Sequence, residues 1–166
     1  INLRGEDELV GARLCSAEDD LLLVSKKGQS IRFTASDETL RPMGRQTSGV
    51  QGMRFNNDDE LLSLTVVRPD TFLLVATSGG YAKRTDIEEY TAQGRGGKGV
   101  LTIQHDPKRG DLVGALVVDL DSEIYAITSS GGVIRTKAKQ VRKEGRQTKG
   151  VRLMNLSDGD TLIAVA

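Results

Sequence analysis

Short apolar runs, each bounded by an acidic or glycine-containing turn, recur along the whole chain and predict β-strands. The runs are rich in Leu, Val and Ile and span about four to seven residues, which is typical of strands. No segment keeps a 3.6-residue hydrophobic period for ten residues with a cap, so no long helix is expected. Single helical turns are expected at residues 36–40 and 86–90. The predicted fold class is all-β.

The expected strands fall into three successive sets of four. They are residues 9–14, 21–24, 30–33 and 50–55; residues 61–67, 72–77, 81–85 and 100–104; and residues 112–118, 124–128, 133–137 and 151–156. Apolar residues near 162 resemble the first strand of each set. We therefore divide the chain into repeats at residues 1–50, 51–100 and 101–151, followed by the opening strand of a further repeat at 152–166.

A glycine-rich basic block recurs with the same period of about 50 residues. The first block is Gly44-Arg45-Gln46-Thr47-Ser48-Gly49-Val50, the second is Gly94-Arg95-Gly96-Gly97-Lys98-Gly99-Val100, and the third is Gly145-Arg146-Gln147-Thr148-Lys149-Gly150-Val151. A Gly-x-x-x-Arg pattern, which ends at Arg32, Arg84 and Arg135, keeps the same spacing. Four strands per repeat predict propeller-like blades, and pairing between neighbouring repeats is expected. A plain β-sandwich is the alternative, but it would not require the block to recur.

The charges are segregated, although the chain carries 23 basic and 23 acidic residues and has no net charge. Of these, 18 basic but only 6 acidic residues lie within residues 26–55, 79–100 and 129–152. Because equivalent residues of a repeated unit occupy equivalent places, the basic segments are expected to line one rim. Charge runs are usually solvated loops, but three in phase favour a band that binds a polyanion.

The composition excludes several classes of site. Cys15 is the only cysteine and His105 the only histidine, so no disulfide within the chain and no Cys- or His-based metal site is expected. We predict no metal, no cofactor and no catalytic residue. The glycines of the second block match a dinucleotide fingerprint formally, but they precede a strand and open no helix. No apolar run approaches the ~20 residues that span a bilayer, so no membrane partner is expected.

The candidate ligand is duplex DNA, bound through its phosphates with little sequence preference. Glycine turns supply backbone N–H groups and the basic side chains supply charge. No recognition helix is expected, and the few aromatic residues are scattered rather than interleaved with the basic segments. The first-ranked phosphate contacts are Arg95, Lys98, Arg45, Arg146 and Lys149, and the second-ranked are Lys83, Arg84, Arg32, Arg135 and Lys137.

The sequence Gln93-Gly94-Arg95-Gly96-Gly97-Lys98-Gly99 resembles the basic box of the C-terminal domain of the DNA gyrase A subunit, usually Gln-Arg-Arg-Gly-Gly-Lys-Gly. Gly94 departs from that pattern and removes one basic side chain. The first and third blocks resemble the weaker copies in the family's other blades, and the resemblance covers the whole chain.

This resemblance implies a β-pinwheel, in which four-stranded blades exchange a strand with their neighbours. A complete domain has about six blades, so the chain is expected to be roughly half of one. The implied function is to wrap duplex DNA on the basic rim, as an accessory part of a type IIA topoisomerase that introduces negative supercoils. Strand cleavage and ATP hydrolysis would belong to other domains.

The resemblance also implies partners and a location, and it leaves two rivals open. The partners would be the rest of the gyrase A subunit and, through it, the gyrase B subunit, in the bacterial cytoplasm at the nucleoid. One rival is the C-terminal domain of the topoisomerase IV A subunit, whose box is degenerate. The other is a propeller-like module whose basic rim binds an acidic protein.

Overall fold

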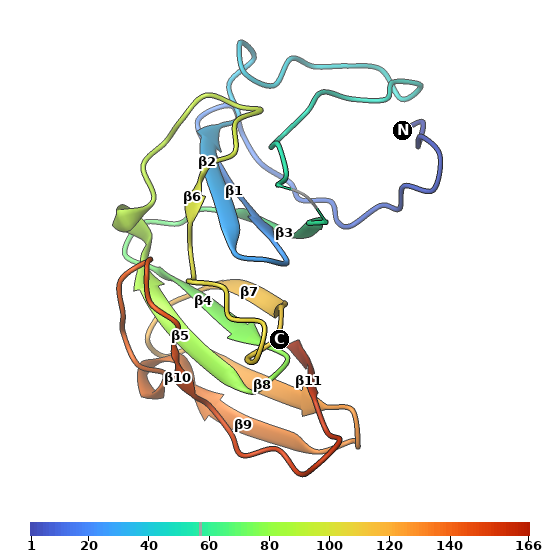
Figure 1. Cartoon of the computed structure of the whole chain (residues 1–166). Coiled ribbons are helices and arrows are strands. Elements are labelled where there is room, and N and C mark those ends of the chain that lie inside the picture. The colour runs from blue at the N-terminus through green and yellow to red at the C-terminus, as the bar shows by residue number, and fades with distance from the viewer. Residues whose placement is uncertain (57) are drawn as a thin grey trace.

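A β-hairpin forms the centre of each of three antiparallel sheets in the computed structural model, which describes residues 1–56 and 58–166 (Figure 1). The hairpins pair β1 (Asp20–Ser25) with β2 (Gln29–Thr34), β4 (Phe72–Thr77) with β5 (Tyr81–Asp86), and β8 (Glu123–Thr128) with β9 (Val133–Lys137). Each turn contains a glycine with φ near +90°, a conformation that side chains with a Cβ rarely adopt. All six strands were predicted from the hydrophobic pattern.

The third strand of every sheet comes from the following repeat. β3 (Leu61–Val66) pairs with β1, β7 (Leu112–Val118) pairs with β4, and β11 (Leu162–Val165) pairs with β8. The expected pairing between neighbouring repeats is therefore confirmed. Each hairpin depends on a strand about 40 residues further along the chain, so successive sheets are linked by backbone hydrogen bonds.

A two-residue strand that follows a glycine-rich block completes the first and second sheets. β6 (Val100–Leu101) pairs with β2, and β10 (Val151–Arg152) pairs with β5, which gives the strand orders β3-β1-β2-β6 and β10-β5-β4-β7. The third sheet has the order β11-β8-β9 within the described residues. The second block thus belongs spatially to the first sheet, and the third block to the second sheet.

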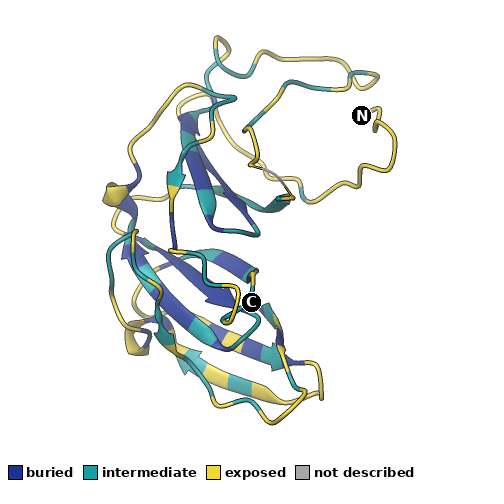
Figure 2. Cartoon of the chain, in the orientation of Figure 1, coloured by how far each residue is buried: buried dark blue, intermediate teal, exposed yellow. Residues whose placement is uncertain are grey.

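Some expected strands are wrong or shorter than predicted. Residues 9–14 and 50–55 form no strand, and Leu9, Val10 and Leu14 are exposed (Figure 2). In the other repeats the corresponding strand pairs with a hairpin one repeat earlier, and none of the described hairpins pairs with residues 9–14. The strands expected at 100–104 and 151–156 shrink to two residues because only these face the edge of the hairpin.

The short helical turns follow the third strand of their repeats. η1 (Ile87–Glu89) confirms the turn expected at 86–90, and η2 (Ala138–Gln140) is its unpredicted equivalent in the next repeat. Residues 36–40 form hydrogen-bonded turns, with the Thr39 and Leu40 amides both donating to the Ser36 carbonyl. In the described residues, no helix is long and apolar enough to cross a membrane.

The core consists of apolar layers between successive sheets. Leu22 and Val24 of β1 pack with Leu73 and Val75 of β4, and the alternate residues of β4 face Ile124 and Ala126 of β8. The strands β1 and β4 are therefore buried on both faces, whereas β8, at the end of the stack, is buried mainly on one. This stacking arranges the sheets along a curve, with both termini on the side opposite η1 and η2 (Figure 1).

Candidate nucleic-acid interface

The second block crosses the edge of the first sheet and is held there by its backbone. The Gln93 amide donates to the Arg32 carbonyl (2.7 Å), the Gly96 amide to the Gly52 carbonyl (2.8 Å), and the Arg54 amide to the Gly97 carbonyl (2.7 Å). At Gly99, where φ is +72°, an added Cβ would lie 1.8 Å from the Ser30 carbonyl oxygen. Glycine is therefore required there for both conformation and close approach.

The two basic side chains of the second block have different environments. The Arg95 guanidinium is half-buried and donates from Nε to the Thr39 carbonyl (2.6 Å) and from Nη1 to the Gln51 carbonyl (2.7 Å). Lys98 is exposed, and its ammonium has no partner among the described residues. Arg95 fastens the block to the preceding segment and keeps its remaining N–H donors, whereas Lys98 offers its whole charge to solvent.

The third block encloses the ammonium of Lys83, which reaches it from β5. Lys83 Nζ donates to the carbonyls of Gly145 (2.6 Å), Arg146 (2.8 Å) and Thr148 (3.2 Å) and to Thr148 Oγ1 (3.0 Å). The residue is fully buried. Burial lowers the pKa of Lys83 to about 8, while the carboxylates of Glu144 and Glu89 oppose that shift. Lys83 therefore holds the block instead of facing solvent.

The basic residues of the third block lie outside that enclosure. Arg146 is half-buried, and its Nη1 donates to the Leu101 carbonyl (3.2 Å). Lys149 is exposed, with Nζ 3.1 Å from Asp106 Oδ2, and this contact holds the pKa of the Asp106 carboxyl below its usual range. The Asp106 carboxylate thus partly neutralises the charge that Lys149 could offer an anion.

The first block is an exposed loop that crosses no sheet in the described residues. Arg45 is exposed, and around Gly49, where φ is +78°, an added Cβ would meet nothing within 4 Å. The Asn2 backbone amide donates to the Thr47 carbonyl (2.9 Å), and Asn2 Nδ2 donates to the Gln46 carbonyl (3.0 Å). These bonds tie the block to the N-terminal segment.

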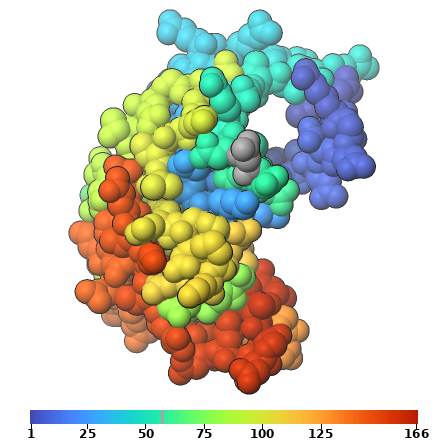
Figure 3. All heavy atoms as spheres, viewed as in Figure 1, coloured from blue at the N-terminus to red at the C-terminus, as the bar shows by residue number. Residues whose placement is uncertain are grey.

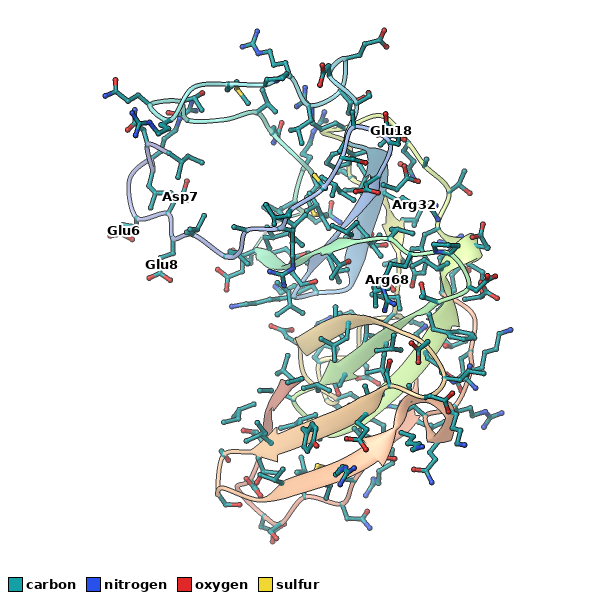
Figure 4. The ribbon with its side chains drawn as sticks, turned by 180° about the vertical axis from the view of Figure 1, so that it is seen from behind. Glu6, Asp7, Glu8, Glu18, Arg32 and Arg68 are labelled. Carbon is teal, nitrogen blue, oxygen red and sulfur yellow. The ribbon has the colours of Figure 1, made fainter. Side chains whose placement is uncertain are left out.

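The arginines of the Gly-x-x-x-Arg pattern form structural contacts. Arg32 pairs with Asp20 (2.7 Å) and donates from Nη1 to the carbonyls of Ile87 and Tyr90, so it joins the first sheet to η1. Arg84 is its counterpart: Nε donates to the Val141 carbonyl (2.9 Å), and the guanidinium lies 4.6 Å from the centre of the Phe72 ring. Figure 4 shows Arg32 directed inward, far from the acidic Glu6, Asp7 and Glu8.

The remaining candidate phosphate contacts, Arg135 and Lys137, are exposed on the last sheet. Arg135 pairs with Glu123 at the surface, and Lys137 is exposed. The nearby Lys139, Arg142 and Lys143 are exposed as well. Exposed basic residues therefore extend from β9 through η2 toward the third block, and the segment that follows β9 lies along the convex margin of the molecule (Figure 3).

Sequence reasoning missed Arg109 and Arg152, which flank the Tyr81 ring. Their guanidinium carbons lie 4.0 Å and 5.5 Å from the ring centre, and Arg109 Nη1 donates to the Gly150 carbonyl (2.9 Å). Arg109 lies outside residues 26–55, 79–100 and 129–152, where the basic residues cluster, so the charge pattern could not indicate it. Its contacts hold the loop before β7 against the third block.

The other chemical groups are arranged as structural contacts. His105 Nε2 lies 2.8 Å from Asp111 Oδ1 at the surface. No three Asp, Glu, His or Cys side chains gather as metal ligands would in residues 1–56 and 58–166. The second block leads into β6 and not into a helix, so the dinucleotide fingerprint lacks the structural setting that it needs.

Comparison with known proteins identifies the family. The family model described as "DNA gyrase C-terminal domain, beta-propeller" matches residues 19–68, 71–119 and 122–166. Each match contains one hairpin and the strand that the next repeat contributes to it. The chain belongs to the DNA gyrase C-terminal domain family. The resemblance inferred from the residues around Arg95 and the all-β propeller-like fold class are both confirmed.

The most similar relatives include gyrase A subunits from mycobacteria and Streptomyces. The chain is 81% identical over its full length to the DNA gyrase A subunit of Mycolicibacterium smegmatis, and 77% identical to that of Mycobacterium tuberculosis. It is 61% identical over 171 aligned residues to the DNA gyrase A subunit of Streptomyces coelicolor. The chain covers about 20% of each of these relatives, and therefore corresponds to one part of a much longer protein.

Solved structures agree with this assignment. The chain superposes on a DNA gyrase A C-terminal domain with a TM-score of 0.82 at 29% identity, over 89% of this chain and 50% of that one. The C-terminal domain of DNA topoisomerase IV gives a TM-score of 0.92 at 23% identity, over 99% of this chain and 51% of that one. At that identity the second likeness concerns the fold alone.

Proposed function

We propose that this chain binds duplex DNA through its phosphates and bends it, as an accessory part of DNA gyrase that supports negative supercoiling. The observation that carries the proposal is the pairing of glycine-shaped loops with exposed cations in successive repeats. Lys98 and Lys149 occupy the same place in the second and third blocks, and both are exposed. A regular spacing of cations on a curved edge fits a duplex backbone that follows the curve.

The proposed contacts are the basic side chains that remain accessible. They are Lys98, Lys149 and Arg45, the free donors of Arg95 and Arg146, and Arg135 and Lys137 on the last sheet. Lys83, Arg84 and Arg32 support this surface from within because their donors bind carbonyl oxygens of the next repeat. If about six of these seven side chains neutralise a phosphate at the same time, the slope of log K against log[salt] should be near −5.

Binding of this kind is largely independent of base sequence. Phosphate contacts fix the position of a protein on DNA, whereas base edges carry the sequence information. The strands and three-residue helical turns of the described residues offer nothing that resembles a recognition helix. Sequence preference should therefore reflect how easily a duplex bends.

In the complete protein, we propose that this surface guides DNA toward catalytic machinery in the remaining four-fifths of the gyrase A subunit and in the gyrase B subunit. The chain itself would act without a cofactor and without a catalytic residue. Strand passage by the complete enzyme would then acquire its direction from the hand of the DNA curve formed here.

A topological assay tests the proposal. A nicked plasmid is incubated with the chain and sealed with ligase, and its linking number is compared with that of plasmid sealed alone. We expect a shift that falls when Lys98 and Lys149 are both changed to alanine. Lys108→Ala serves as the matched control, because Lys108 is an exposed lysine outside the three blocks.

The outcomes of this assay separate the functions. A shift that survives Lys98→Ala/Lys149→Ala would overturn the assignment of the blocks as DNA contacts. Binding without any shift would limit the chain to holding DNA rather than curving it. No binding even at low salt would reject the DNA proposal and favour a basic surface that docks an acidic protein.

A further inference from the structure

The strand position that faces each block holds a different residue in the first two sheets. Ile31 in β2 pairs with Leu23, and Lys83 in β5 pairs with Val75, so the two residues are equivalent in register. Both are fully buried. Ile31 lies beneath the second block, where its Cδ1 is 3.7 Å from the point that a Cβ on Gly97 would occupy. Lys83 lies beneath the third block.

The blocks differ at the positions that contact this residue. The second block, with the residue before it, reads Gln93-Gly94-Arg95-Gly96-Gly97, and the third reads Glu144-Gly145-Arg146-Gln147-Thr148. Gly96 has φ of +85°, whereas its counterpart Gln147 is not among the residues with positive φ. The two loops therefore follow different backbone paths over an apolar and a charged residue.

The third block supplies what a buried ammonium needs. A lysine ammonium has three N–H donors, and four acceptor oxygens lie within 3.2 Å of Nζ. The Thr148 hydroxyl also lies 2.9 Å from Glu144 Oε2, so a carboxylate stands directly behind one of the groups that bind the ammonium. An unpaired buried charge would be costly, so this set of contacts specifies one loop conformation.

Isoleucine, the residue at the equivalent position of the first sheet, could not replace Lys83 without changes in the third block. With isoleucine at position 83, the carbonyls of Gly145 and Arg146 would face hydrocarbon and lose the ammonium as a donor, and Gly145 would keep only the Thr148 hydroxyl. Conversely, a Cβ on Gly97 would be in van der Waals contact with Ile31 Cδ1 (3.7 Å), and a threonine hydroxyl at that position would face this apolar side chain with no ammonium to bind. Each block is therefore matched to the residue beneath it.

We propose that Lys83 is a positioning residue that fixes the backbone of the third block, and that the residue at this strand position selects the block type. Lysine selects Glu-Gly-Arg-Gln-Thr and isoleucine selects Gln-Gly-Arg-Gly-Gly. The effect of Lys83 on Arg146 and Lys149 as phosphate contacts rests on the proposed DNA function, but the matching of residue and block does not.

Hydrogen exchange of the free chain tests the matching directly. In Lys83→Ile, we expect the amides of Glu144 and Gln104, which donate to the Arg84 carbonyl (3.0 Å) and the Thr148 carbonyl (2.9 Å), to exchange at least about tenfold faster. The reason is that the charge-assisted hydrogen bonds holding the block between them are lost. Adding Glu144→Gln, Gln147→Gly and Thr148→Gly converts the loop to the second block's type and should restore slow exchange. These three loop substitutions without Lys83→Ile should loosen the loop.

Rescue is the deciding readout, because a merely structural lysine would not be replaced by changes in the loop. If Lys83→Ile unfolds the second sheet, recovery of the circular dichroism spectrum in the four-substitution variant supports the proposal equally. A second variant, Thr148→Val, keeps Lys83 and removes one acceptor, and should speed exchange of the same amides by a smaller factor. Unchanged exchange in Lys83→Ile, or no rescue by the loop substitutions, would overturn the proposal.

DNA binding is measured separately on the same variants. If Lys83→Ile loosens the loop and weakens binding several-fold, with both restored by the loop substitutions, the matching and the proposed function stand together. If exchange changes and DNA affinity does not, Lys83 still positions the block, but the block is not a DNA contact.

Discussion

Alanine substitution of the last glycine of each block should destabilise the chain to a graded extent. Gly49, Gly99 and Gly150 occupy the same place in the three blocks, and their φ angles are +78°, +72° and +78°. The conformational cost of a Cβ is therefore nearly the same at all three. Only the surroundings differ, so the series separates backbone strain from close packing.

The structure sets the expected order. At Gly49 a Cβ would meet nothing within 4 Å, so the loss of stability comes only from holding alanine in the left-handed conformation, which costs about 1–2 kcal/mol. Part of this cost is offset because alanine lowers the conformational entropy of the unfolded chain. At Gly150 the Cβ would lie 3.0 Å from the Ala82 carbonyl oxygen, and a small shift should add about 1 kcal/mol. At Gly99 it would lie 1.8 Å from the Ser30 carbonyl oxygen.

That overlap cannot be relieved by a side-chain movement, because the obstructing atom belongs to the backbone of β2. The block must move away and give up the β2–β6 pairing at Gln29–Leu101 and Ser30–Val100. We expect Gly99→Ala to lower the free energy of unfolding by about 3 kcal/mol or more.

Urea denaturation followed by circular dichroism measures the series. Hydrogen exchange of the β2 amides shows whether the loss is local to the first sheet, as expected when stability is distributed over repeats. Equal losses at the three glycines, or the largest loss at Gly49, would refute the argument that the second block packs directly on β2.

Three further predictions concern charged side chains. Asp106→Asn removes the carboxylate that competes with DNA phosphate for Lys149, and should raise DNA affinity several-fold in a binding titration at fixed salt. Unchanged affinity would mean that Lys149 does not contact phosphate. Arg84→Met removes a hydrogen bond to the next repeat and a ring contact within its own hairpin, and should lower the free energy of unfolding by about 1–3 kcal/mol in urea denaturation. An unchanged free energy of unfolding would count against this linking role. The pKa of Lys83 is about 8 in the folded chain against 10.5 for an ordinary lysine, so between these values the unfolded chain binds more protons. Denaturation at several pH values should show wild type gaining stability relative to Lys83→Met as the pH rises from 8 to 10.5, with no further change below 8; a constant difference across that range would contradict the lowered pKa.

The hairpins were predictable because their signals are local. Apolar runs such as residues 21–24, together with glycine turns such as that at Gly28, specify strand, turn and strand within about 15 residues. The 50-residue period then indicated the repeated architecture. The family resemblance likewise rested on one contiguous stretch around Arg95 and Lys98.

The strands contributed from elsewhere in the chain were less predictable. Residues 9–14 resemble β3 and β7 in their apolar residues but form no strand, because a strand requires a partner and none of the described hairpins pairs with them. Residues 50–55 form no strand either, because Gly52 and Arg54 exchange backbone hydrogen bonds with the second block and not with a hairpin. Pattern alone identifies segments that can pair, whereas pairing itself depends on a hairpin about 40 residues away.

At the candidate site, too, the sequence predicted one part and the tertiary structure decided the other. The sequence by itself determined that basic residues and glycines recur together, and that the chain is built of β repeats. Only the tertiary structure decided which cations are available: Lys98 and Arg45 are exposed, whereas Lys83 binds carbonyl oxygens 62 to 65 residues further along the chain. The physical reason is that a basic side chain binds whichever acceptors the fold brings within hydrogen-bond distance, and composition does not record them.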